Sequence, residues 1–261
     1  MDEGKIKRDV QEYEQQVSRA GVMGRKLTVT KLSLGVLGFM LVCTCGMAVS
    51  GSALLGFPYY SWHQKMTIEV NVGGQLYASS SVVAMSGRRL PELLPEGRVR
   101  DLDMRGEAVV VDLPKNQYLF ALLTYDAYLT GKVFHDLVGG VVSQPEEWAS
   151  EIDDVQEIRE IHPKDYPLLV TFTDINDPKT VKEVDPDNLE AMFGPGVSLK
   201  RITLEITDED VTEGKVEQVL GWWCALRKKQ ARLNGSTSVA IMDNELSNNL
   251  GTGSFRIGDC T

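Results

Sequence analysis

The most informative thing this sequence lacks is charge over one long stretch. No Asp, Glu, Lys or Arg occurs between Lys31 and Lys65, and residues 32–55 are apolar apart from glycine and small hydroxyl residues. As a helix rising about 1.5 Å per residue, this segment would be roughly 36 Å long, whereas the hydrocarbon core of a bilayer is about 30 Å thick. A helix buried in a globular core rarely needs that length. The segment therefore predicts one transmembrane helix at 32–55.

The flanks of this segment indicate its orientation. Basic residues mark the cytoplasmic side of a membrane span, and aromatic rings prefer the level of the lipid headgroups. Basic residues precede the segment and aromatic residues follow it. We therefore predict membrane-interface positions for Arg25, Lys26, Lys31, Phe57, Tyr59, Tyr60 and Trp62. The predicted topology has a cytoplasmic tail at 1–31 and an exported body after the span.

A cleaved secretory signal is the alternative interpretation of the same residues, because it also combines basic residues, an apolar core and small residues. Ser50, Gly51 and Ser52 before Ala53 could form a cleavage site, which would release a soluble secreted domain. The long leader and the long apolar segment favour the uncleaved anchor. The glycine and serine residues of the span would also let a second helix approach closely, so we predict that the anchor helices of two chains can associate.

The net charge of -10 is divided unevenly along the chain. Residues 1–31 carry seven Lys or Arg against five Asp or Glu, a charge of +2, so the remainder carries -12. An acidic body repels the phosphate backbone that supplies most affinity for nucleic acid, which argues against nucleic acid as the main partner. The predicted partners are the lipid bilayer and a protein partner.

Recognisable catalytic signatures are also lacking. His63, His135 and His162 stand apart, so no helical histidine pair is available for zinc, and there is no nucleophile elbow, phosphate-binding glycine loop or dinucleotide fingerprint. The Asp and Asn residues at 174–177 and 185–188 fail the spacing of a calcium loop and are interpreted as helix caps. We expect no cofactor and no metal, and no catalytic residue is assigned.

Cysteine is scarce, with four residues in the chain, and only Cys224 and Cys260 lie in the predicted exported part. An oxidising compartment permits disulfides, so these two residues are a candidate pair that would tie the polar C-terminal residues to the body. The sequence leaves open whether their Cα atoms come within bonding range.

Residue patterns in the exported part predict an α+β domain with a mainly antiparallel sheet and a few short helices. Strands are expected in a hairpin at 66–72 and 75–85 around Gly73 and Gly74, in a second hairpin at 107–113 and 117–123, and at 168–172 and 200–207. Helices are expected at 145–161, 186–193 and 211–223, and residues 88–105 as an irregular connection. The predicted boundaries are an aromatic interfacial linker at 56–65, the domain at 66–233 and a loosely ordered polar tail at 234–261.

The run TFTDINDPKTVKEVDPDNLEAMFGPGVSLKRITLEITDEDVT at 171–212 and the segment YASSSVV at 77–83 resemble a pattern in uncharacterised single-pass proteins of proteobacteria. In those proteins a basic N-terminus and one anchor helix precede an exported domain. The resemblance covers residues 60–225. It implies a bacterial inner-membrane protein with a cytoplasmic N-terminus and a periplasmic domain, and it implies no activity.

The sequence therefore favours a membrane-anchored periplasmic module for binding or assembly. A membrane-anchored hydrolase with carboxylates dispersed along the chain is the alternative, because such residues leave no local signature. An enzyme would bring titratable groups together in a deep pocket, whereas a binding module would not need them.

Overall fold

The structure is a computed structural model of the 261-residue chain, and it describes residues 59–88, 101–123, 128–137, 145–152, 155, 157–237, 245–258 and 260. The predicted tail, the predicted span and the predicted interface residues Arg25, Lys26, Lys31 and Phe57 lie outside this set. Within the set, no helix combines the length and the apolar character that a membrane crossing requires.

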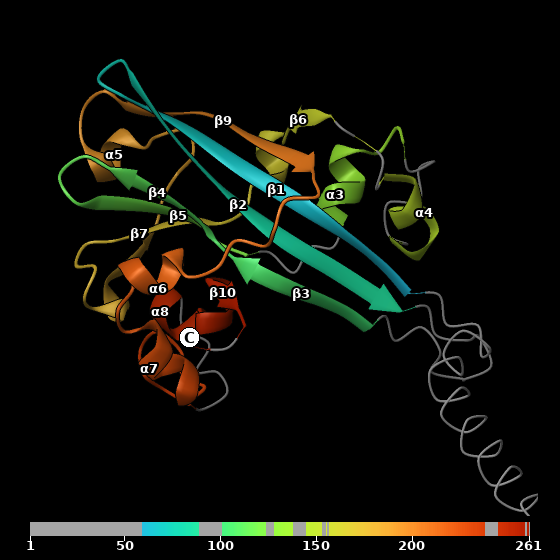
Figure 1. The fold of residues 1–261 in the computed structure, drawn as a ribbon. Coiled ribbons are helices and arrows are strands. Elements are labelled where there is room, and N and C mark those ends of the chain that lie inside the picture. Colours follow the sequence, from blue (N-terminus) through green and yellow to red (C-terminus); the bar gives the residue numbers. More distant parts are fainter. Residues whose placement is uncertain are drawn as a thin grey trace, which may run out of the picture. The chain divides into compact units, whose positions relative to one another are not determined.

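The described part of the chain forms two antiparallel sheets with short helices, which confirms the predicted α+β class (Figure 1). The large sheet has the strand order β10-β3-β2-β1-β9-β6, and the small sheet has the order β4-β5-β7-β8. The strands are β1 (Tyr59–Val72), β2 (Gln75–Arg88), β3 (Asp101–Glu107), β4 (Val109–Leu113), β5 (Gln117–Ala121), β6 (Ile158–Glu160), β7 (Leu169–Phe172), β8 (Val181–Glu183), β9 (Val197–Ile206) and β10 (Arg256–Ile257).

The helices are short and lie mostly between strands or after β9. They are α3 (Tyr128–Val133), α4 (Pro145–Ile152), α5 (Glu190–Phe193), α6 (Lys215–Val219), α7 (Trp223–Lys228) and α8 (Leu246–Asn249), with the 3-10 turns η1 (Pro163–Asp165), η2 (Pro178–Thr180) and η3 (Thr252–Ser254). Helices this short are not stable alone in water, so their packing against the sheets must hold them.

The hairpin of β1 and β2 forms around the predicted glycines. Gly73 and Gly74 have φ angles of 56° and 88°, and a two-residue turn that needs two positive φ angles favours glycine at both positions. The strands pair over their whole length, from Val72 opposite Gln75 to Tyr59 opposite Arg88. This hairpin is longer than predicted, because β1 begins at Tyr59.

The early start of β1 corrects the prediction of an aromatic linker at 56–65. Trp62 is 2% exposed, its ring centroid lies 5.2 Å from that of Trp148, and its Nε1 donates a hydrogen bond to Thr130 Oγ1. Tyr60 is buried beside it. Both rings belong to the domain core and are not available to lipid headgroups. Tyr59, 63% exposed, remains free to contact a surface outside the domain.

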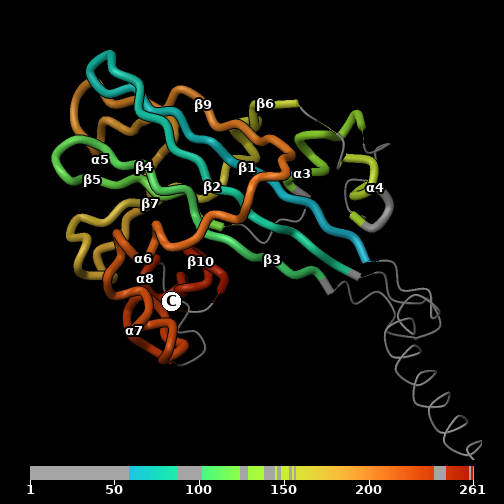
Figure 2. The backbone as a smooth tube through the Cα atoms, viewed as in Figure 1, coloured from blue at the N-terminus to red at the C-terminus, as the bar shows by residue number. Residues whose placement is uncertain are grey.

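The small sheet is the middle of three layers. Its strands bury side chains on both faces, so Leu119 on β5 packs in the core shared with the large sheet while Phe120 packs in a second core. The second core is closed by residues of α6, α7 and the C-terminal segment, among them Trp223 and Phe255. We call α6, α7 and the described C-terminal residues that follow them the helical layer. Figure 2 shows the late, red part of the chain on the side of β4, β5 and β7 away from β1 and β9. Strands buried on both faces carry continuous apolar runs rather than alternation.

Several predicted boundaries were wrong, two of them because strand pairing overrides local pattern. The helix predicted at 145–161 ends at Ile152, and residues 158–160 form β6 because they pair with the edge of β9. The connection predicted at 88–105 contains the start of β3, paired to β2. The helix predicted at 186–193 shortens to α5, although Asp185 accepts a hydrogen bond from the Asp187 amide and so begins a turn there. The helix predicted at 211–223 shortens to α6, and α7 begins only at Trp223, where that helix was predicted to end.

The tail predicted to be loosely ordered from residue 234 is also corrected where it is described. Phe255 and Arg256 are buried, and the Phe255 carbonyl accepts a hydrogen bond from the Ala108 amide at 2.7 Å. Residues 256–257 form β10 against β3. Because the segment is polar overall, the sequence did not indicate that Phe255 is needed to close the second core.

Residues 207–214 cross the outer face of the large sheet between β9 and α6 (Figure 1). Lys65 Nζ lies 2.5 Å from Glu209 Oε1, and His63 Nδ1 donates to the Glu209 carbonyl oxygen at 2.8 Å. At the far edge, Thr212 exchanges two hydrogen bonds with the main chain of Val82, at 2.9 and 3.0 Å. We call residues 207–214 the crossing segment. It connects the large sheet to the layer of short helices on the far side of the small sheet.

The three-layer arrangement predicts that neighbouring residues of β5 are equally important for stability. Leu119→Ala and Phe120→Ala should each lower the free energy of unfolding by about 2–5 kcal/mol, because each opens a cavity in a different core. Thr67→Ala, on the solvated face of β1, should change it by less than about 0.5 kcal/mol. Urea unfolding of the full chain in nonionic detergent, followed by tryptophan fluorescence, measures all three. If Phe120→Ala left the free energy of unfolding unchanged, the helical layer would not cover β5.

Candidate functional site

A buried carboxylate connects the large sheet to the helical layer. Glu107, at the end of β3, is 1% exposed and accepts hydrogen bonds from the amides of Lys215 and Val216 at 3.0 and 3.1 Å. These amides belong to the first turn of α6, where a carboxylate is favourable because the amides have no partner within the helix. Both carboxylate oxygens of Glu107 are therefore engaged in holding α6 after the crossing segment, and the cavity that Glu107 lines with other described residues measures about 20 Å³.

The carboxylates of the outer surface are held ionised by basic neighbours. A hydrogen bond from Arg201, and then one from Lys200, lowers the pKa of Glu69. Arg159 lowers the pKa of Asp136, and Arg105 lowers the pKa of Glu213. A general acid needs a raised pKa, so these pairs are suited to structure and not to proton transfer.

Each of the three histidines forms a hydrogen bond with the main chain. His63 Nδ1 donates to the Glu209 carbonyl, and His135 Nδ1 donates to the Lys132 carbonyl at 3.2 Å. His162 Nδ1 accepts from the Lys164 amide at 3.3 Å and caps η1.

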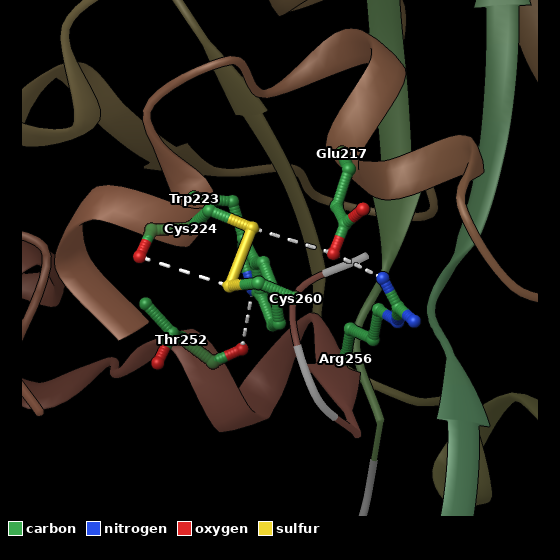
Figure 3. The surroundings of a disulfide bond; sticks show 6 residues. All are labelled: Glu217, Trp223, Cys224, Thr252, Arg256 and Cys260. Atoms are coloured by element: carbon green, nitrogen blue, oxygen red, sulfur yellow. Dashed lines mark hydrogen bonds and ion pairs between the residues drawn. A yellow bond between two sulfur atoms is a disulfide. The ribbon is translucent and has the colours of Figure 1, made fainter. Parts of the chain in front are cut away.

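The two cysteines predicted as a candidate pair form a disulfide in the helical layer (Figure 3). Their Cα atoms are 5.7 Å apart, within the usual range for a bridge. Glu217 Oε1 lies 3.5 Å from Cys224 Sγ and also forms an ion pair with Arg256, which is buried with its guanidinium 5.5 Å from the centre of the Trp223 ring. The bridge thus joins α7 to residues next to the buried end of β10.

Glu217, Cys224 and Cys260 are the one described group of three side chains whose metal-binding atoms converge, within 4.8 Å of one another. Metal ions bind thiolates, and both sulfur atoms are consumed by the disulfide. The carboxylate already neutralises the buried charge of Arg256. This group therefore does not fit a metal ion while the disulfide is closed.

A cavity of about 840 Å³ is lined by residues of α7, of the chain after α7 and of the C-terminal segment. Arg227 and Lys228 at the end of α7 contribute to its wall, and Arg232 follows a short distance along the chain. The remaining wall is neutral: Gln230, Ala231, Asn249, Gly251, Thr252, Gly253 and Cys260. No carboxylate and no histidine is among these described lining residues. We call this space the basic cavity.

The arginines of the basic cavity differ from the other arginines whose side chains are described. Arg105, Arg159, Arg201 and Arg256 each form an ion pair with a glutamate or aspartate. Arg227 and Arg232 form none with any described residue. Arg232 Nη1 instead donates to the carbonyl oxygens of Asn248 and Asn249, at 2.5 and 3.3 Å. These bonds fix the orientation of the guanidinium, and no described carboxylate pairs with its charge.

The basic cavity was not predicted from the sequence. The signal was present as the run RKKQAR at 227–232, four basic residues within six positions of an acidic domain. A basic run is usually a solvated surface, and the sequence does not reveal that the neutral segment at 249–253 forms the opposite wall. Among the predicted interface residues that are described, Tyr59 alone is exposed, and Tyr60 and Trp62 are not part of any surface site.

Comparison of the chain with models of protein families, with curated proteins and with solved structures gave no match. The function must therefore be argued from the residues and their geometry.

The disulfide predicts a clear redox dependence of stability. In a background with Cys43→Ser and Cys45→Ser, reduction should lower the free energy of unfolding by about 2–4 kcal/mol, because the bridge closes a loop of 36 residues. Cys224→Ser with Cys260→Ser should match the reduced form and no longer respond to a reductant. Urea unfolding with and without dithiothreitol measures the effect. Two titratable thiols in the oxidised, denatured protein would contradict the bridge.

The ion pairs of Glu69 predict a pH dependence of stability. Because folding lowers its pKa from an ordinary value of 4.5, the stabilisation is complete above that value and is lost as the pH falls through the folded value. Glu69→Gln should therefore be less stable at pH 7, by about 0.5–1 kcal/mol, and equal to the parent protein near pH 3. Glu183→Gln is the control, because Glu183 is exposed on β8 and pairs with no described cation. A difference that persists unchanged at pH 3 would exclude the ion pairs as its cause.

Proposed function

We propose that this protein is a single-pass inner-membrane protein that presents its α+β domain to the periplasm as a binding module. In this proposal residues 1–31 lie in the cytoplasm, residues 32–55 span the membrane, and the partner or ligand is bound by the exported domain. The observation that carries the binding role is the basic cavity, whose described wall combines three cations with neutral groups and no acid or base.

The anchor is supported by the sequence and is compatible with the start of the fold. Residues 32–55 contain no charge and are long enough to span a bilayer. The first strand begins at Tyr59, a few residues beyond the predicted end of the span. A short connection of this kind would hold the domain close to the membrane surface, with exposed Tyr59 at its entry point. The closed disulfide fits an oxidising compartment.

Binding is favoured over hydrolysis by the arrangement of the titratable groups. A hydrolase needs a nucleophile or an activated water molecule, and a base or acid within hydrogen-bond reach of it. The described carboxylates with altered pKa values are paired with arginine or lysine at the surface, and Glu107 is bonded to main-chain amides. None of these groups lines the basic cavity. The arrangement can hold a charged ligand without transforming it.

The topology is tested with the full chain carrying an N-terminal epitope, expressed in a bacterium. Trypsin added to spheroplasts should digest the C-terminal body and leave a small membrane-bound fragment that retains the epitope, because residues 1–31 would be protected in the cytoplasm. Lysed spheroplasts are the control, in which the epitope should be lost. N-terminal sequencing of the membrane fraction should also find no chain beginning near Ala53. Mature protein beginning there would establish the cleaved signal and a secreted domain.

A further inference from the structure

We propose that the basic cavity is the ligand site of the domain, and that it binds the phosphate or pyrophosphate group of a small organic molecule. This proposal rests on the binding function proposed above and adds the chemistry of the ligand. It is carried by the volume of the cavity, by its arginines having no counterion among the described residues, and by the hydrogen bonds that hold Arg232.

The charges of the wall define the kind of group that fits. Arg227, Lys228 and Arg232 place three positive charges around one space, and no described carboxylate neutralises them there. Leaving such charges close together is unfavourable unless an anion joins them. An arginine guanidinium presents a planar fork that matches the oxygen atoms of phosphate, and lysine adds a point charge. A group with two or three negative charges complements this wall better than a single carboxylate.

The position of Arg232 indicates preorganisation for a ligand. Its Nη1 is bonded to the carbonyl oxygens of Asn248 and Asn249, so the guanidinium is fixed before any ligand arrives. Its other N–H groups are not engaged by these bonds. A donor that is already oriented binds an anion without a further loss of side-chain freedom, which increases affinity.

The neutral part of the wall sets the size of the ligand. A cavity of about 840 Å³ lies in the range of about 300–1,000 Å³ that holds small organic molecules, and it is larger than one phosphate group requires. Gly251 has an extended φ of -116°, and a Cβ built on it would meet no atom within 4 Å. The backbone at Gly251 therefore does not require glycine, and the cavity has room there for a larger side chain. The space beside the cations can hold the organic part of the ligand.

The direct test is calorimetric titration of the full chain in nonionic detergent with inorganic pyrophosphate. Arg227→Gln and Lys228→Gln should each weaken binding about tenfold, the size expected for loss of one charged contact. Lys229→Gln is the matched control, because Lys229 is adjacent and exposed but does not line the cavity, and it should weaken binding less than twofold. Thermal melting verifies that all three variants fold. Equal effects of the three variants would reduce the binding to general surface charge and overturn the site.

A second pair of variants acts from the opposite wall. Gly251→Asp should weaken pyrophosphate binding by tenfold or more, because it adds a negative charge inside the cavity without steric conflict. Gly251→Ala should leave binding within twofold of the parent protein. If both variants bind like the parent protein, the ligand does not occupy this cavity and the proposal is wrong.

The source of the phosphate group is distinguished by two further titrations. Mixed micelles containing phosphatidylglycerol, compared with phosphatidylcholine micelles, test a lipid headgroup. Binding of phosphatidylglycerol that is lost in Arg227→Gln assigns the phosphate to a lipid, whereas binding of pyrophosphate alone assigns it to a soluble ligand. Citrate bound more tightly than pyrophosphate, or no binding of any probe, would overturn the phosphate assignment. Neither result depends on the trypsin experiment, so the topology stands or fails separately.

Discussion

The structure depends on one constraint, which is that the small sheet is apolar on both faces. A strand such as β5, with Leu119 pointing to one side and Phe120 to the other, cannot leave either face in water. The large sheet covers one face. The other face must be covered by the chain that follows β9, whose described helices are all short. Burial of Trp223, Leu233 and Phe255 against β5 and β7 meets this need.

This constraint also explains where the buried hydrogen bonds, the ion pair of Arg256 and the disulfide of the domain are found. The crossing segment brings the chain from the large sheet to the uncovered face, and Glu107 fixes the first turn of α6 at its arrival. The disulfide and the ion pair of Arg256 with Glu217 then hold helices that are too short to be stable alone. The outer side of the same layer is left with basic residues and an open neutral segment. The basic cavity is therefore formed by the element that covers the second core.

The sequence pattern predicted correctly those elements whose conformation depends on residues close together in the chain. The first hairpin was predicted correctly because Gly73 and Gly74 determine its turn, and the pairing of Cys224 with Cys260 was proposed because no other cysteine lies in that part of the chain. Residues 158–160 were predicted as helix, although β9 draws them into a strand. Tyr60 and Trp62 were assigned to the lipid interface because their aromatic character is the same in a core as in a membrane belt. The basic cavity was missed because residues 227–232 and 249–253 meet only in three dimensions.

The strand order of the large sheet has a consequence for the folding reaction. β1, β2 and β3 follow one another in the chain and pair in that order, but the other neighbour of β1 is β9 and that of β3 is β10, both far along the sequence (Figure 1). Contacts between residues so distant in sequence form slowly, because a long loop must close before they contribute. Until they form, the long first hairpin offers an unpaired edge of 14 residues on which chains can associate. Newly made chains therefore expose this edge to association with other chains for longer than a helical protein of the same length would.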